Sequence, residues 1–228
     1  ALVLAVLPGL LPAGVFRVRR GLPALVVFRT MITASFFGAE VFVPLMLVAL
    51  RGLAPAPSGL VLTAGAVGWF VGSWTQGRPG LRIERTTLVV VGGATLGAGV
   101  LTMVAAPQPG VPVPVVALCW AVAGLGMGLS MACSSVLLLR LSAPEQQGRN
   151  ASAMQIGDSL GGVLGIGVAG AVFASGHDPA GDDTGVYMLI WVVLGAIGLL
   201  SALAGARIRP RVRPRVRPRG RPRVSGSP

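Results

Sequence analysis

The sequence predicts an all-α membrane protein with six transmembrane helices. Hydrophobic residues make up 53% of its 228 residues and charged residues only 11%, which is too little polar surface to cover a water-soluble protein of this length. Apolar runs of about 20 residues recur, each long enough as a helix to cross a hydrocarbon core of about 30 Å. The alternating pattern of an outer-membrane barrel is missing, so we expect helical spans.

The six predicted spans follow one another with short connections. Residues 1–13 are apolar but too short to cross a bilayer, and we expect them to be the end of a helix that begins before this sequence. A polar turn precedes the second span, where Ser58 is predicted to be the N-terminal cap. The predicted spans cover residues 22–50, 58–76, 87–106, 113–139, 151–174 and 186–206, and together they form a bundle over residues 14–206.

The last segment, residues 207–228, differs in composition from the rest of the chain. Arginine occupies every second position from Arg207 to Arg223, and proline recurs every fourth residue. Proline at this density forbids a helix, so we expect a disordered, extended tail. Its charge favours anionic lipid at about 1 kcal/mol per arginine near the surface, and without interleaved aromatic residues we expect no nucleic acid partner.

The arginine distribution predicts the orientation in the membrane. All 19 basic residues are arginine, and 17 of them fall in the first, third and fifth extramembrane segments and the tail. Arg51 is alone in a loop on the opposite side, and Arg29, near the basic end of the first span, is predicted to snorkel to the interface. Because arginine concentrates in cytoplasmic segments, we expect both ends of the sequence to be cytoplasmic. The composition is also typical of a GC-rich bacterial genome, which indicates the inner membrane of a bacterium.

A short repeat indicates how the six helices are related. The pattern L-R-x-x-A-P-x-x-x-G covers residues 50–59 and again residues 139–148, each time joining the first and second helices of a triplet. Three helices separate the copies, so the second triplet has the opposite orientation. The sequence therefore predicts an inverted 3+3 repeat, and glycines such as Gly97 and Gly165 are predicted to let its helices approach closely.

Two acidic residues lie inside predicted spans. A charged side chain at mid-bilayer costs roughly 2.5–3.5 kcal/mol on insertion scales, so Glu40 in the first span is a candidate proton-carrying or substrate-binding residue. Pro44 leaves the carbonyl of Glu40 without its helical hydrogen bond. The alternative is a structural pair with an arginine or tyrosine of another helix.

Asp158 in the fifth span is the second acidic candidate, with Gln155 three residues earlier on the same helix face. Asp158 would carry a proton or contact a cationic substrate. Alternatively, it lies in an aqueous vestibule and does neither. No cluster of cysteine and histidine residues indicates a metal site, and Cys119 and Cys133, about 21 Å apart along one predicted helix, are predicted to be free thiols.

The phrase APEQQGRNASAMQIGDSLGGVLGIGVAGAVFA, residues 143–174, together with the six spans, resembles the C-terminal half of a major facilitator superfamily transporter, and most closely the bacterial drug:proton antiporters. Members of that family often carry the loop G-x-x-x-x-R-x-G-R between the second and third helices of a half. Gly77, Arg82 and Arg85 match this motif, while Glu84 replaces its second glycine. The resemblance covers residues 14–206 and leaves the tail outside.

The resemblance implies a part of a secondary transporter that exports small molecules or drugs, coupled to protons, by alternating access. Its partners would be the lipid bilayer, the missing N-terminal half of the transporter, the substrate and protons, and it would need no cofactor. Two alternatives remain: a membrane anchor that acts through its basic tail, and, less favoured, an intramembrane enzyme. An enzyme would need a nucleophile with a histidine, or paired catalytic acids, inside the membrane, whereas the only histidine, His177, lies in a predicted loop.

Overall fold

The computed structural model describes residues 14–80, 82–179 and 181–208. In this part of the chain six helices are long and apolar enough to cross a membrane, and the predicted all-helical fold is confirmed. They are α2 (Leu22–Arg51), α3 (Pro55–Gly77), α4 (Arg85–Thr102), α5 (Val113–Leu141), α6 (Gln147–Gly176) and α7 (Thr184–Ala206). Short 3-10 turns, η1 (Val15–Arg17), η2 (Met103–Ala105) and η3 (Pro144–Gln146), lie beside them. The expectations for residues 1–13 and for the tail from residue 209 lie outside the described residues.

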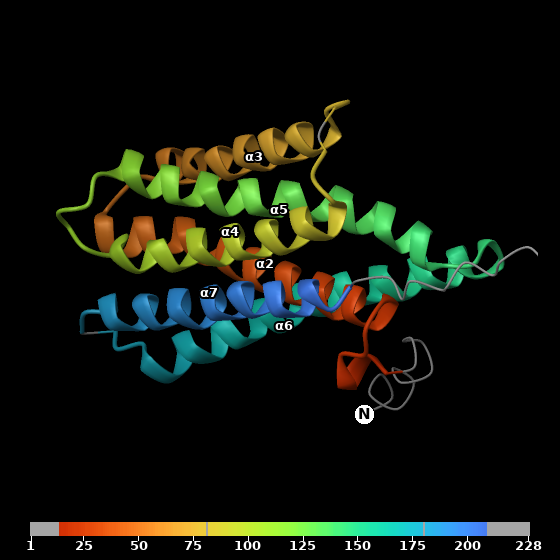
Figure 1. Ribbon diagram of the computed structural model, residues 1–228. Coiled ribbons are helices and arrows are strands. Elements are labelled where there is room, and N and C mark those ends of the chain that lie inside the picture. Colours follow the sequence, from red (N-terminus) through yellow and green to blue (C-terminus); the bar gives the residue numbers. More distant parts are fainter. Residues whose placement is uncertain (1–13, 81, 180, 209–228) are drawn as a thin grey trace, which may run out of the picture.

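The helices lie side by side, and their connections alternate between the two ends of the bundle (Figure 1). The turns that follow α2, α4 and α6 are at one end, and those that follow α3 and α5 are at the other. Each helix therefore runs opposite to the one before it, as successive crossings of a membrane require.

The packing of the helices follows the predicted inverted repeat. Helix α3 of the first triplet (α2, α3, α4) packs against α5 of the second triplet (α5, α6, α7), and α6 of the second packs against α2 of the first. In the same way α4 packs against α5, α7 packs against α2, and α4 meets α7. Exchanging the triplets turns α3–α5 into α6–α2 and α4–α5 into α7–α2, and it leaves the pair α4–α7 unchanged. Helix α2 is the most buried of the six, whereas α3 and α6 have the largest exposed share.

Glycines bring the backbones of α2 and α6 into direct contact. A Cβ atom added to Gly165 would lie 2.0 Å from the carbonyl oxygen of Ala34, and one added to Gly161 would lie 2.3 Å from that of Thr30. The pair α4 and α7 is similar, because a Cβ on Gly97 would lie 2.3 Å from the backbone nitrogen of Leu199. The predicted close approach at these glycines is confirmed, and it fixes the faces that α2 and α6 turn toward each other.

The predicted cap at Ser58 is wrong. Helix α3 begins at Pro55, with Ala54 as its N-cap, and the Ser58 hydroxyl lies within the first turn, where it donates to the carbonyl oxygen of Ala54 at 3.0 Å. Proline explains the difference, because its fixed φ angle and missing N–H suit the first helical position, so α3 starts three residues earlier. The two cysteines are free thiols, as predicted.

Arg51 at the end of α2 holds the connection between α4 and α5. Its guanidinium donates to the carbonyl oxygens of Ala106 at 3.0 Å, Gln108 at 2.8 Å and Val111 at 2.6 Å. Because three carbonyl groups would lose a charged donor, we expect Arg51→Met to lower the free energy of unfolding by about 1–3 kcal/mol. Reversible unfolding in mixed micelles measures this, with the exposed Arg20→Met as control. Equal stabilities of the two variants would contradict the role of Arg51.

Candidate functional site

Arg29 of α2 and Asp158 of α6 form an ion pair inside the bundle. The Nε atom of Arg29 donates to Oδ1 of Asp158 at 2.9 Å, and Nη2 donates to Oδ2 of the same carboxylate. Their side chains are only 7% and 10% exposed. The prediction that Arg29 snorkels to the interface is therefore wrong. Moving the guanidinium outward would leave the Asp158 carboxylate buried and unpaired, which is costly in a low-dielectric interior.

Helix α5 completes the binding of the Arg29 guanidinium. The Nη1 atom of Arg29 donates to the hydroxyl of Ser134 at 3.0 Å, to the carbonyl oxygen of Met131 at 3.3 Å and to the hydroxyl of Ser135 at 3.4 Å. These α5 residues were not predicted from the sequence. The signal that points to them is an adjacent pair of serines in an apolar span that also has to satisfy a buried arginine. Arg29 thus joins α2, α5 and α6.

A hollow of about 370 Å³ opens beside this ion pair, and we call it the Arg29 hollow. It is lined by Arg29, Thr33 and Phe37 of α2, Met131 of α5, and Gln155, Asp158, Ser159 and Gly162 of α6. Two predicted site residues, Gln155 and Asp158, therefore lie in one hollow. The volume falls within the range of about 300–1,000 Å³ for small-molecule pockets. Its walls combine polar groups with the apolar surfaces of Phe37 and Met131, a combination suited to an amphipathic molecule.

Glu40, the other predicted acid, lies apart from the ion pair. It is eleven residues beyond Arg29 on α2, about 16 Å along the helix axis, and it is not among the residues that line the Arg29 hollow. Its side chain is half-buried, and among the described residues it makes no ion pair. Thr33, Phe37 and Glu40 follow one another at helical spacing, so Glu40 extends the same face of α2 beyond the hollow.

The predicted loop motif lies at the turn between α3 and α4. Gly77 is the last residue of α3 and Arg85 the first of α4, while Arg82 is exposed between them. Nη1 of Arg85 donates to Oε1 of Gln76 at 3.2 Å, and the thiol of Cys133 on α5 reaches the same oxygen at 3.5 Å. Gln76, which was not predicted, thereby connects α3, α4 and α5. In this structure Gly77 ends α3, Arg85 of α4 binds Gln76 of α3, and Arg82 is exposed.

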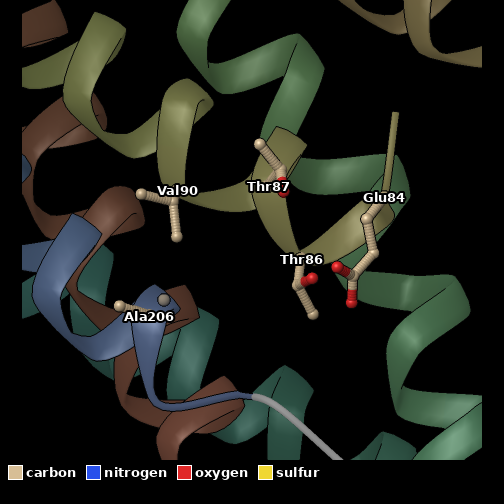
Figure 2. A pocket seen from close by; sticks show the side chains of 6 residues that line it. Glu84, Thr86, Thr87, Val90 and Ala206 are labelled. Atoms are coloured by element: carbon tan, nitrogen blue, oxygen red, sulfur yellow. The ribbon is translucent and has the colours of Figure 1, made fainter. Parts of the chain in front are cut away.

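A second hollow, of about 240 Å³, lies where α4 begins and α7 ends. Figure 2 shows Glu84 and Thr86 on one side and Val90 with Ala206 on the other. Glu84, which stands where the family motif usually has glycine, supplies its only carboxylate among the described lining residues. The structure describes no cluster of three or more potential metal ligands within residues 14–80, 82–179 and 181–208.

Comparison with known proteins agrees with this architecture. A family model described as Major Facilitator Superfamily matches residues 25–226, most of the chain. The match runs beyond residue 206 into the Arg/Pro-rich segment, which the sequence analysis placed outside the resemblance. No curated protein matches the sequence. The six apolar helices and the family match together show that this multi-pass membrane protein belongs to the major facilitator superfamily, a family of membrane transporters.

Proposed function

We propose that this chain is part of a proton-coupled secondary transporter that moves small molecules, such as drugs, out of a bacterial cell by alternating access. It would act together with an N-terminal half in the inner membrane. The observation that carries the proposal is the buried pair of Arg29 and Asp158 at the wall of a hollow. Ionisable groups within spans are costly and mark substrate or proton sites in membrane proteins.

The ion pair offers a physical link between a proton and a helix movement. While Asp158 is ionised, its carboxylate accepts two charge-assisted hydrogen bonds from Arg29, which hold α6 against α2. A proton on Asp158 removes the negative charge and weakens this attraction. Proton binding and release would therefore shift the balance between two arrangements of α6 on α2, as alternating access requires. Glu40, half-buried in the span formed by α2, is the second candidate for a proton-carrying group.

We expect Asp158→Asn to reduce proton-driven transport by the full-length protein to the level of protein-free vesicles. Asparagine keeps the size of the side chain and can accept a hydrogen bond from Arg29, but it has no proton to exchange at this carboxyl position. The measurement is substrate flux in proteoliposomes with an imposed pH gradient. The control is Asp182→Asn, an exposed acid beside the start of α7.

Glu40→Gln separates the two acidic candidates in the same assay. If Asp158→Asn keeps the parent's flux and pH dependence while Glu40→Gln loses them, Glu40 is the coupling residue and Asp158 has a structural role. If neither substitution changes the pH dependence of transport, proton coupling at this site is wrong.

We also propose that the turn between α3 and α4 faces the cytoplasm, because arginine concentrates in that segment and in the others on its side. Arg82→Cys and Asp182→Cys are the two reporter positions, in a background where Cys119 and Cys133 are replaced by serine. In intact cells, a membrane-impermeant maleimide should label the cysteine at position 182 but not that at position 82. Labelling at both positions from outside would contradict this topology.

A further inference from the structure

We propose that the Arg29 hollow binds the carboxylate of a small organic anion, and that the anion and a proton on Asp158 are loaded together. This inference rests on the proton coupling of the proposed function and adds a substrate class to it. Because the anion and the proton cross the membrane together, an inward proton gradient drives uptake, so the inference replaces export by uptake. It departs from the cationic substrate that an isolated acidic residue would favour. Three features carry it: the charges that face the hollow, the geometry of the Arg29 guanidinium, and the mixed lining.

The charges at the hollow come from one residue of each sign. Helix α2 contributes Arg29 and helix α6 contributes Asp158, while helix α5 contributes the hydroxyls of Ser134 and Ser135. An arginine remains protonated in proteins, so only Asp158 changes its charge. The net charge of this pair is therefore zero when Asp158 is ionised and +1 when it is protonated, and it is never negative.

Other charged groups of the neighbouring helices are distant along their own axes. On α2 Glu40 lies about 16 Å from Arg29, and on α6 Arg149 lies about 13 Å from Asp158. On α5, Arg140 lies about 13 Å along the axis beyond Met131, which lines the hollow. Helix α7, which packs against α2 and α6, carries Asp183 and Arg207 just beyond its two ends. None of these groups is among the residues that line the hollow. The balance of charge at the hollow therefore depends on Arg29 and Asp158.

The orientation of Arg29 suits a carboxylate. Its Nε and Nη2 atoms point together at the two oxygens of Asp158, which is the edge by which guanidinium groups bind carboxylates in parallel. Nη1 is held separately by Ser134 and the Met131 carbonyl, so the guanidinium stays in place when Asp158 releases it. The edge facing Asp158 is thus preorganised for a second carboxylate.

Loading then exchanges one ion pair for another. A proton from solvent binds a carboxylate oxygen of Asp158, and the charged pair between Arg29 and Asp158 is lost. The carboxylate of the ligand pairs with Nε and Nη2 of Arg29, and the new O–H of Asp158 donates to a ligand oxygen. The hollow returns to zero net charge, so neither a buried charge nor a buried donor is left without a partner.

A cationic ligand has no comparable arrangement. It would have to displace Arg29 from Asp158 and leave a buried guanidinium without its counter-ion, at a net charge of +1. The remaining lining agrees with an organic acid, because the exposed Gln155 and Ser159 offer hydrogen bonds, whereas the buried Thr33 hydroxyl already donates to backbone carbonyls of α2. Phe37 and Met131 offer an apolar surface for the rest of the molecule.

Benzoate, benzamide and benzylammonium test this inference, since they share a ring and differ in charge. Isothermal titration calorimetry of the full-length protein, in two buffers of different ionisation enthalpy, counts the protons exchanged on binding. We expect benzoate to bind with uptake of about one proton, so its affinity should rise as the pH falls. Benzamide should bind more weakly, and benzylammonium should not bind.

Two variants make the test specific. Asp158→Asn retains Arg29 and should bind benzoate without proton uptake and without pH dependence. Arg29→Gln should lose at least about tenfold in benzoate affinity, the equivalent of one charge-assisted hydrogen bond. Asp158→Asn alone suffices if Arg29→Gln does not fold.

The outcomes distinguish the two proposals. Benzylammonium binding with release of a proton would overturn the anionic substrate class and leave Asp158 as the coupling residue. Absence of benzoate binding over the measured pH range would also overturn the inference. So would benzoate binding that stays pH-dependent in Asp158→Asn. The proposed function fails separately, if Asp158→Asn protein still transports with the parent's pH dependence.

Discussion

Arg29→Met should lower the free energy of unfolding by about 3–5 kcal/mol, the range for breaking one side of a buried ion pair. The methionine leaves the Asp158 carboxylate without its charged partner and leaves the hydroxyls of Ser134 and Ser135 without their shared donor. The measurement is reversible unfolding of the purified protein in mixed micelles of mild and denaturing detergent.

A double variant separates the loss of the pair from the loss of packing. Arg29→Met with Asp158→Leu removes both charges, so we expect it to recover most of the stability lost by Arg29→Met alone. Arg20→Met, at an exposed position before α2, is the control for removing an arginine and should change stability by less than about 0.5 kcal/mol. If Arg29→Met is as stable as Arg20→Met, the ion pair does not hold the helices together.

Gly165→Val should be the second variant with a large effect, lowering the free energy of unfolding by about 3 kcal/mol, the upper part of the usual range for overpacking. A Cβ atom at this position would lie 2.0 Å from the carbonyl oxygen and 2.7 Å from the Cα of Ala34. Both are backbone atoms of α2, so no side chain can rotate away and the two helices have to separate. Separation also weakens the contact between Arg29 and Asp158, two turns away on the same interface.

Gly167→Val is a matched control on the same helix. A Cβ at Gly167 meets nothing within 4 Å, so the same substitution two residues away adds a side chain to open space. We expect its stability to stay within about 0.5 kcal/mol of the parent. Equal destabilisation by both variants would show that valine disturbs α6 itself rather than its contact with α2.

The sequence predicts six long apolar helices well because hydropathy is a local property of each segment. The sequence could likewise predict that Gln155 and Asp158 lie together, since residues three apart lie on one face of a helix, and both line the Arg29 hollow. The role of Arg29 could not be predicted, because its partner Asp158 is 129 residues away in the chain. Spacing along one helix does not say which face of which other helix it will meet.

A more useful signal was present in the charges themselves. Arg29 and Asp158 are unlike charges near the same end of two spans, and a membrane interior penalises each of them unless they meet. Treating each charge alone favoured the interface for Arg29. The misplaced cap at Ser58 has a simpler cause, since proline at the first helical position outweighed a hydroxyl three residues later.

The 129 residues that separate Arg29 from Asp158 along the chain have a consequence for biosynthesis. At roughly 5–20 residues per second, a ribosome needs about 6–26 s to reach Asp158 after it has added Arg29. During this interval α2 enters the membrane with a guanidinium that has no counter-ion. Arg29 lies seven residues from the start of α2, about 10 Å along the axis, so we expect its long side chain to extend toward the lipid headgroups in the nascent protein. When α6 arrives, we expect Asp158 to bring the same side chain into the bundle, where the structure shows it.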